Sequence, residues 1–368
     1  MKNRIALLLF LSVFFACSKS ENLPDQTTPA ETSLYFPPTN DTQWETIDIN
    51  SLNWNTSELE NLYNYLLTND TRAFIVLKEG KIAIEKYWGN TILNKSEFNA
   101  NSQWYWASAS KALTATLVGI AQKEGKLDLH DKTSDYLGNA WTSTALEKED
   151  LITIKHQLSM TTGLNYNVSD LDCQEPDCLA YGTDAGDQWY YHNAPYTLLH
   201  QVLQKATGMD YNLYTNQKIK SVIGMDGKWI TTGSNTVYWS TARAMARFGL
   251  LTLNKGVWKN TEALYKNDFF FEMTASSQNL NPSYGYLWWL NGKNKIALPG
   301  ISKTFPTSLA TNAPDDLFAG MGKNGQFVAI VPSQNLVVIR MGEDPSTTLV
   351  PVEFHNKIWE KLNAVLQK

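Results

Sequence analysis

A serine and a lysine three residues apart, Ser108 and Lys111, open an apolar stretch that runs from Ala109 to Ala121. Residues three apart share one face of a helix, and a helix that is apolar on every side is buried in a protein core. A buried ammonium is costly, so such a lysine is paired or loses its proton more easily than usual. A neutral Lys111 amine could take the proton of the Ser108 hydroxyl and make it a nucleophile. The alternative is a helix-capping serine followed by a lysine that reaches the surface.

A second candidate segment is Tyr191-His192-Asn193. A phenol beside a lysine can relay a proton to a leaving group, and the amide of Asn193 can donate to or accept from a substrate amide or carbonyl. The same Tyr-x-Asn spacing recurs at 214–216 and 265–267, so aromatic packing beside a helix is an alternative for each of them.

A third candidate segment is Lys323-Asn324-Gly325-Gln326, which leads into an apolar run at 327–331. Glycine beside a strand allows backbone N–H groups to approach a ligand closely, so Gly325 and Gln326 could contact a substrate carbonyl oxygen. Lys323 could meet a substrate carboxylate. The bare Lys-x-Gly spacing also occurs at 78–80 and 123–125.

In this order, the three segments resemble the Ser-x-x-Lys, Tyr-x-Asn and Lys-Thr-Gly motifs of the serine β-lactamase and penicillin-binding-protein superfamily. The most similar branch is that of the class C-related serine hydrolases, which includes esterases, D-aminopeptidases and 6-aminohexanoate-dimer hydrolases. The resemblance covers about residues 70–345. It includes further segments at 126–131, 154–164, 240–250 and 284–289.

The resemblance implies a covalent acyl-enzyme mechanism. Ser108 would be the nucleophile, Lys111 its base, and Tyr191 the group that completes the proton relay, with Asn193 facing the substrate. The backbone N–H groups of Ser108 and Gln326 would form the oxyanion hole. No metal or organic cofactor is implied, because side chains and backbone donors suffice for this route.

The substrate implied is a small molecule with an ester or amide bond, with β-lactams and D-amino-acid peptides among the candidates. The third segment lacks the threonine of the family motif, which favours esterase or amidase members over true β-lactamases. An alternative is a catalytically silent cell-wall or ligand-binding protein on the same scaffold. A Ser-His-Asp hydrolase is disfavoured, because no Gly-x-Ser-x-Gly segment occurs in the chain.

The N-terminus has the pattern of an export signal. Lys2 and Arg4 precede an apolar run from Ile5 to Phe15, which is too short to span a bilayer. The segment ending at Cys17 resembles a bacterial lipobox, although Phe14 stands where leucine is common. We expect residues 1–17 to be a signal peptide that ends at a lipidated Cys17. The lipid would anchor the exported protein to a membrane of the cell envelope, in the periplasm or at the outer membrane. An ordinary secretory signal is the alternative.

Residues 18–42 contain four of the 13 prolines and are predicted to be a tether. The remaining cysteines, Cys173 and Cys178, flank a turn-prone Gln-Glu-Pro-Asp segment, and an oxidising compartment would allow a disulfide between them. A zinc site is the alternative, but it lacks a second ligand pair at suitable spacing.

Composition and periodicity define the scaffold. The 368 residues are 43% hydrophobic and carry a net charge of −5, which excludes a disordered chain and argues against nucleic acid as a partner. Strand patterns lie near both ends, at 73–77, 82–84, 327–331 and 336–339, and helical patterns lie at 196–206, 241–253 and 354–366. We therefore expect an α/β (α+β) fold over 43–368. Its antiparallel sheet would come from both chain ends and be flanked by helices, with a mostly helical subdomain at roughly 116–270 and Trp288 and Trp289 near the cleft.

Overall fold

The computed structural model describes residues 34–264, 268–301, 303–344, 346 and 348–367. The folded unit begins at Leu34. The predicted signal peptide with Cys17, and the part of the predicted tether at 18–33, lie outside the described residues.

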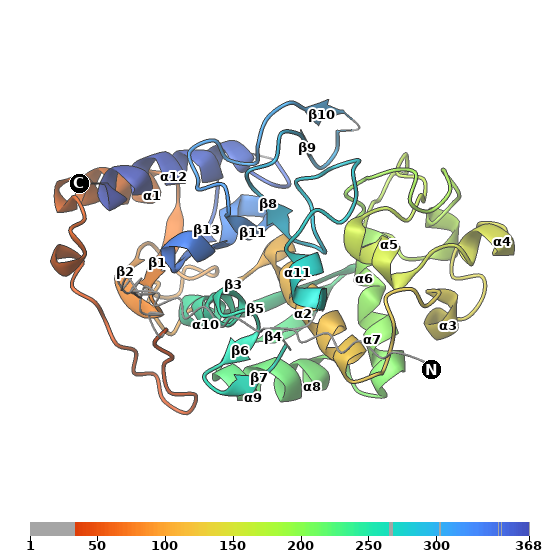
Figure 1. The fold of residues 1–368 in the computed structure, drawn as a ribbon, viewed down its shortest axis with the longest axis horizontal. Coiled ribbons are helices and arrows are strands. Elements are labelled where there is room, and N and C mark those ends of the chain that lie inside the picture. Colours follow the sequence, from red (N-terminus) through yellow and green to blue (C-terminus); the bar gives the residue numbers. More distant parts are fainter. Residues whose placement is uncertain (1–33, 265–267, 302, 345, 347, 368) are drawn as a thin grey trace, which may run out of the picture. The chain divides into compact units, whose positions relative to one another are not determined.

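The central sheet has six antiparallel strands in the order β2-β1-β13-β12-β11-β8 (Figure 1). Strand β1, near the beginning of the chain, pairs with β13, near its end, which confirms the sheet predicted from the two chain ends. Every residue of β12 and β13 is buried, because helices cover both faces of the sheet. The strands are β1 (Thr71–Lys78), β2 (Lys81–Tyr87), β8 (Trp289–Leu290), β11 (Phe318–Gly322), β12 (Gln326–Val331) and β13 (Leu336–Gly342).

Three helices cover this sheet. The terminal helices α1 (Leu59–Thr68) and α12 (Val352–Leu366) lie together on one face, where Phe354 packs against Phe327 of β12 (Figure 1). On the other face, α10 (Ala242–Leu253) approaches closely through Gly249, whose missing side chain leaves room for Val337 of β13.

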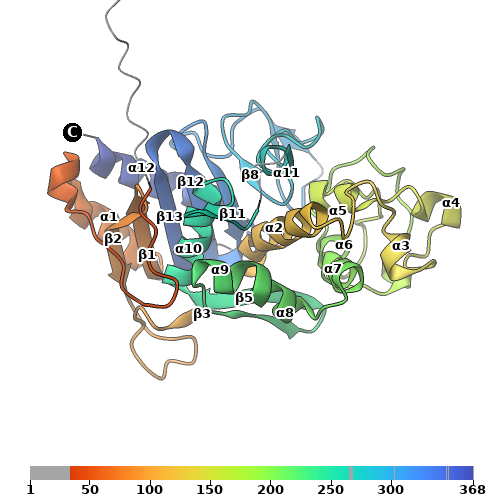
Figure 2. The same ribbon diagram turned by 60° about the horizontal axis from the view of Figure 1, so that its bottom comes forward.

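Helix α2 (Ser110–Lys123) runs from the sheet into the helical region, which lies on the side of α2 away from the sheet (Figures 1 and 2). Twelve of its fourteen residues are buried, as the apolar pattern predicts. The helical region comprises α3 (Ser134–Leu137), α4 (Leu146–Glu149), α5 (Ile154–Ser159), α6 (Asn193–Thr197), α7 (Leu199–Thr207), α8 (Tyr211–Thr215) and α9 (Ser221–Ile223).

The predicted limits of the helical subdomain, 116–270, are too wide. Strands β4 (Lys228–Thr232) and β5 (Asn235–Thr241) form a hairpin that pairs with β3 (Gln103–Tyr105), and α10 belongs to the layer over the main sheet. The remaining elements are short: α11 (Asp268–Met273), β6 (Val257–Trp258), β7 (Thr261–Glu262), β9 (Ile296–Ala297) and β10 (Thr304–Phe305).

The predicted tether boundary at residue 42 also differs from the structure. Tyr35 N donates to Glu79 O over 3.0 Å, and the guanidinium of Arg247 donates to the carbonyl oxygens of Pro38 and Asp41. Residues 34–42 therefore pack on the folded unit. The pattern of proline and polar residues did not reveal this, because the backbone bonds leave no sequence signal and the ring contact of Phe36 with Trp258 joins distant parts of the chain.

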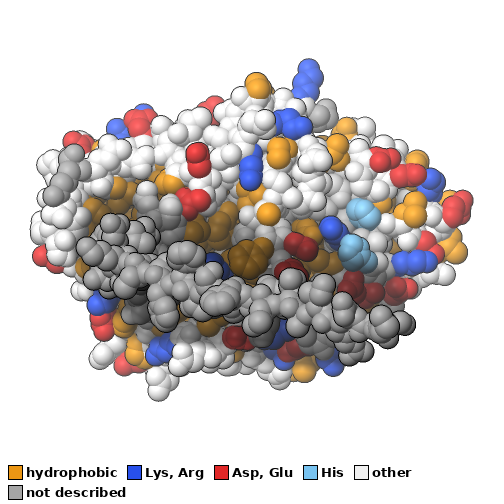
Figure 3. Space-filling view, in the orientation of Figure 1, with side chains coloured by type: hydrophobic (Ala, Val, Ile, Leu, Met, Phe, Trp, Pro, Cys, Tyr) orange, Lys and Arg blue, Asp and Glu red, His pale blue; other side chains and the backbone are white. Residues whose placement is uncertain are grey.

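The described surface gives two further observations. Where described residues form the face in Figure 3, lysines and arginines lie singly among acidic and apolar side chains. Within the described ranges, no helix combines the length and the apolar character that crossing a bilayer requires.

Candidate active site

Ser108 and Lys111 lie side by side. Ser108 sits in a single 3-10 turn, η3 (Ala107–Ala109), immediately before α2, and Lys111 Nζ lies 2.9 Å from Ser108 Oγ. Lys111 is 2% exposed, so it does not reach the surface, whereas Ser108 is partly exposed. The serine does not cap α2, because the capping position is Ala109 and no side chain there accepts a hydrogen bond. Its hydroxyl is thus available for chemistry.

The backbone around Ser108 is held from both sides. Ala107 has a φ of 46°, a left-handed conformation that is unfavourable for a residue with a side chain and is often found at functional sites. Trp106 is fully buried and donates from Nε1 to Ser240 Oγ over 2.8 Å, while Ser110 Oγ accepts from Tyr238 N over 2.9 Å. These bonds to β5 fix the turn that carries Ser108.

The second predicted segment meets the first. Asn193, the first residue of α6, places its Oδ1 2.9 Å from Lys111 Nζ. The ring centroids of Tyr191 and Tyr196 lie 4.8 Å and 4.1 Å from the same nitrogen. Tyr214, from a competing Tyr-x-Asn segment, instead bonds to Glu124, and the segment at 265–267 lies outside the described residues.

The hydroxyl of Tyr191 is buried and has no partner of good hydrogen-bond geometry in the described part of the chain. Burial raises the pKa of this phenol, and its interaction with Ser108 lowers that pKa by a smaller amount. Tyr191 is therefore protonated at neutral pH, and its hydroxyl lies close enough to Ser108 for the two side chains to interact.

Burial lowers the pKa of Lys111 to about 7, and the negative charge of Asp172 opposes part of that shift. Near neutral pH a large fraction of Lys111 is thus an uncharged amine that can accept the Ser108 proton. Asp172 is a site neighbour that the sequence analysis missed, and its only sequence signal is its position next to Cys173.

We expect ester hydrolysis to depend on pH through Lys111. The protonated amine cannot accept a proton, so kcat/KM should rise with pH and level off above about 7. Tyr191 remains protonated over this range, because burial raises its pKa. A pH–rate profile between about pH 5 and about pH 9 tests this. A profile that is flat through neutrality, or that falls as pH rises, would contradict it.

The third predicted segment lies at the turn η6 (Lys323–Gly325) between β11 and β12. Gly325 faces Arg340 of β13 and Phe354 of α12. The side chain of Gln326 donates to Gly342 O and accepts from Gly342 N, so it packs against β13. Lys323 is exposed. The predicted contribution of the Gln326 N–H to an oxyanion hole stays a prediction.

The glycine that lies against the nucleophile is Gly322, the last residue of β11. A side chain there would place its Cβ 2.8 Å from Ser108 N and 2.7 Å from Trp106 O. The pairing of β8 with β11 covers only Phe318 and Ala319, so this end of β11 extends past its neighbour in the sheet. The Lys-x-Gly pattern led to Gly325 because only the strand register distinguishes the two glycines.

Gly322→Ala should reduce kcat by about 100-fold or more, since displacing one oxyanion donor has an effect of that size. Gly322 has ordinary extended backbone angles, with a φ of −137°, so the expected cause is lack of space beside the Ser108 amide. The measurement is kcat per folded molecule together with the thermal midpoint.

Gly249→Ala is the matched control, because its Cβ would meet Val337 at 2.5 Å on the face of the sheet covered by α10. It should lower stability and leave kcat per folded molecule nearly unchanged. Full activity of Gly322→Ala would show that the space beside Ser108 is not needed.

Arg340 positions the turn η6 between β11 and β12. It is completely buried on β13 and donates to the carbonyl oxygens of Asn324 and Gly325 over 2.6 and 3.1 Å, and to Asn69 O over 2.7 Å. Burial lowers its pKa to about 9. No sequence pattern indicated this arginine, because its role depends on which carbonyl groups the fold gathers around it.

The two tryptophans expected near the cleft are both fully buried. Trp289 stacks on Tyr191 with ring centroids 5.8 Å apart and supports it from behind, while Trp288 packs on Phe248 and Phe318 in the core. Neither lines an open cleft.

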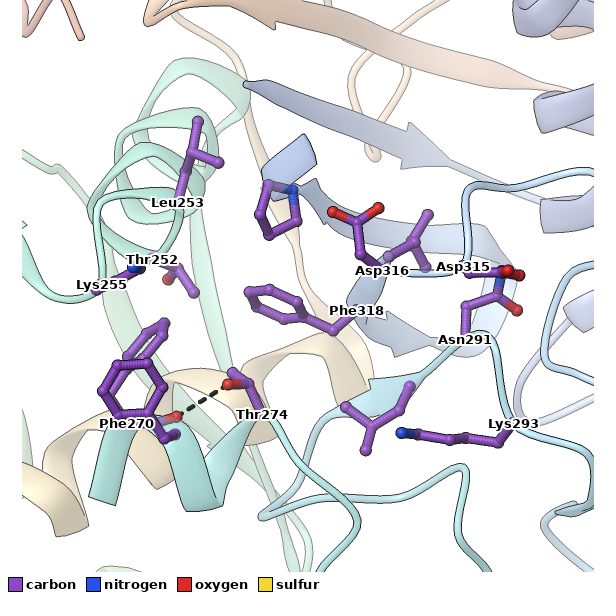
Figure 4. Close-up of a pocket in the computed structure, with 14 residues that line it drawn as sticks. Thr252, Leu253, Lys255, Phe270, Thr274, Asn291, Lys293, Asp315, Asp316 and Phe318 are labelled. Atoms are coloured by element: carbon purple, nitrogen blue, oxygen red, sulfur yellow. Dashed lines mark hydrogen bonds between the residues drawn. The ribbon is translucent and has the colours of Figure 1, made fainter. Parts of the chain in front are cut away.

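A cavity of about 300 Å³ lies between α10, α11, β8 and the start of β11 (Figure 4). Phe270 and Phe318 lie across from each other there, with Asp315, Asp316 and Lys293 at the rim. Ser108, Lys111, Tyr191 and Asn193 do not line this cavity. We therefore give the cavity no part in the chemistry of the Ser108–Lys111 pair. Among the described residues, no three His, Cys, Asp or Glu side chains are grouped as metal ligands would be.

Comparison with known families agrees with this geometry. A family model described as "Beta-lactamase" matches residues 70–349. The chain belongs to the beta-lactamase family. This match and the shared fold confirm the family that the resemblance in the sequence predicts.

The curated relative described next shares little sequence identity with this chain. PbpX of Bacillus subtilis (strain 168), described as a candidate penicillin-binding protein, is 24% identical over 160 residues, or 41% of this chain. The match spans only 39% of that relative's own length.

Two solved structures share the fold. A candidate 6-aminohexanoate-dimer hydrolase from Bacillus anthracis has a TM-score of 0.62 at 19% identity and covers 83% of each chain. A family VIII carboxylesterase has a TM-score of 0.65 at 14% identity, and the match covers 88% of this chain and 99% of the carboxylesterase. At these identities the likeness establishes the fold alone.

Proposed function

We propose that this protein is an extracytoplasmic serine hydrolase that cleaves an ester or amide through an acyl-enzyme on Ser108. One observation carries the proposal: the buried Lys111 Nζ lies 2.9 Å from the partly exposed Ser108 Oγ. A weak nucleophile beside a base whose pKa lies near neutrality is the arrangement that acyl transfer requires.

The chemistry follows from the positions of these groups. The neutral Lys111 amine takes the Ser108 proton, and Oγ attacks the substrate carbonyl carbon to form a tetrahedral intermediate. The backbone N–H of Ser108, which lies beside Gly322, stabilises the oxyanion together with the predicted second donor, the backbone N–H of Gln326.

The protonated Lys111 and the Tyr191 phenol then return a proton to the leaving group, and the carbon–leaving-group bond breaks. Water attacks the carbonyl carbon of the resulting acyl ester and gives its proton to the same base. The bond between that carbon and Ser108 Oγ then breaks, the proton returns to Oγ, and the carboxylic acid is released. Asn193 holds the Lys111 amine through its Oδ1 and leaves its NH₂ group for the substrate.

We expect short acyl esters to be better substrates than β-lactams. The strand end that lies against Ser108 reads Gly320-Met321-Gly322 and the turn after it Lys323-Asn324-Gly325, so neither offers a hydroxyl to bind a β-lactam carboxylate. The carboxylesterase of the same fold is consistent with this preference.

The test compares kcat/KM for p-nitrophenyl butyrate and for nitrocefin with purified protein, using Ser108→Ala as the background. Ser108-dependent ester hydrolysis that exceeds nitrocefin turnover supports the ranking. Nitrocefin turnover well above ester hydrolysis would overturn it.

The extracytoplasmic part of the proposal is supported by the export pattern ending at Cys17 and by the disulfide between Cys173 and Cys178. Disulfides persist mainly in oxidising compartments. If Cys17 is lipidated, cells grown with labelled palmitate should label the wild-type chain and not Cys17→Ala. Equal labelling of both chains would contradict lipidation at this residue.

A further inference from the structure

The loop that carries the disulfide places a carboxylate beside the proposed proton relay. Leu171 O accepts from Ala194 N over 2.9 Å, and Ala194 directly follows Asn193, whose Oδ1 contacts Lys111. Asp172 follows Leu171 in the chain, so its position is tied to the helix that carries the relay.

The rest of the loop is held equally firmly. Cys173 is bonded to Cys178, which closes the loop directly after Asp172. Gln174 Nε2 donates to Ser234 O of the turn between β4 and β5 over 2.7 Å, and the Asp170 carboxylate accepts from Asp172 N over 2.9 Å. Asp172 therefore occupies a fixed position rather than the tip of a free loop.

The Asp172 carboxylate has unused acceptor capacity. Among the described residues, its buried Oδ1 has no hydrogen-bond partner, and no ion pair within 4.0 Å joins the carboxylate to a cation. A buried carboxylate oxygen without a partner is costly. Lys111 does not supply the missing partner, because the contacts of its Nζ are with Ser108 Oγ and Asn193 Oδ1.

The surroundings indicate that a ligand would supply it. The charge of Asp172 acts on Lys111, Tyr191 and Tyr196, the groups that surround the reacting hydroxyl. A carboxylate oxygen that lacks a partner beside these groups suits the N–H of a cationic ligand group.

We propose that Asp172 is a specificity residue that binds a protonated amine of the substrate, so that the enzyme prefers amine-bearing esters or amides over uncharged ones. This inference rests on the proposed hydrolase function and narrows its substrate class. It requires no step beyond the acyl transfer already described.

The test uses pairs of substrates that differ in charge and hardly in shape. On the acyl side, the p-nitrophenyl ester of β-alanine is paired with p-nitrophenyl butyrate. On the leaving-group side, S-(2-dimethylaminoethyl) thioacetate, whose tertiary amine is protonated at neutral pH, is paired with S-(3-methylbutyl) thioacetate. The readout is the ratio of kcat/KM for the charged substrate to that for its neutral partner, in wild type and in Asp172→Asn.

Asp172→Asn should lower this ratio about tenfold or more in at least one pair, which is the loss expected for a charged hydrogen bond. Asp177→Asn is the matched control, because Asp177 lies in the same disulfide loop and is exposed. It should leave the ratio unchanged.

Two outcomes would overturn the inference. One is an unchanged ratio in both pairs. The other is a parallel fall for charged and neutral substrates, which would show that Asp172 acts only on the relay. Both leave the hydrolase proposal standing as long as neutral ester hydrolysis depends on Ser108, whereas hydrolysis that survives in Ser108→Ala would refute the proposed function itself.

Discussion

Ser108→Ala should lower kcat/KM for p-nitrophenyl butyrate by about 10⁴-fold or more, because removing the nucleophile abolishes the covalent route. The substitution removes one oxygen atom from a partly exposed turn residue, and its lost contact is the one to Lys111. Folding should therefore be preserved. The measurement is ester hydrolysis alongside the thermal midpoint of both proteins.

Ser102→Ala is a suitable control, since Ser102 lies in the same part of the chain and its hydroxyl accepts from the backbone N–H of Asn99, away from the Ser108–Lys111 pair. It should retain wild-type kcat/KM. If Ser108→Ala and Ser102→Ala hydrolyse the ester equally well, Ser108 is not the nucleophile.

Lys111→Met should lower kcat/KM by about 1,000-fold, within the range for loss of a general base. Methionine has a similar length and fills the same buried space without an amine. The rise of activity with pH described above should disappear as well, because no titrating base remains.

The same substitution should not destabilise the fold. The folded-state pKa of Lys111, about 7, lies below its ordinary value of 10.5, so the unfolded chain binds more protons between these two pH values. The wild-type free energy of unfolding should therefore rise with pH above about 7 as this penalty is relieved. Lys111→Met should lack that dependence and be at least as stable at neutral pH.

Lys126→Met, at an exposed position just beyond α2, serves as the control and should keep both activity and the pH dependence. A Lys111→Met protein that retains more than about a tenth of wild-type kcat/KM would show that another group acts as base.

Local patterns in the sequence predicted the scaffold well. The strands at both chain ends, the buried helix after Ser108 and the last helix all have periodicities that directly reflect their burial. The spacing of Ser108 and Lys111 left a capping serine with a lysine at the surface as an alternative, and the structure decides between the two by placing the side chains 2.9 Å apart.

Features that depend on tertiary register were not predictable in this way. Gly322 and Gly325 look alike in the sequence, and only the packing of β11 against Trp106 and Ser108 identifies the glycine that needs to lack a side chain. Asp172 is held near the site by the backbone hydrogen bond from Ala194 N to the preceding Leu171 O and by the disulfide that follows it, and neither contact leaves a pattern around an aspartate.

The central claim is that the Ser108 oxygen becomes covalently acylated with help from Lys111. The most direct measurement is the mass of the protein after incubation with a fluorophosphonate probe, followed by peptide mapping. We expect a single adduct on the peptide that contains Ser108, strongly reduced labelling of Lys111→Met, and none of Ser108→Ala. An unmodified Ser108 after prolonged incubation, or an adduct on another residue that persists in Ser108→Ala, would contradict the mechanism, and the former would favour a silent binding protein on this scaffold.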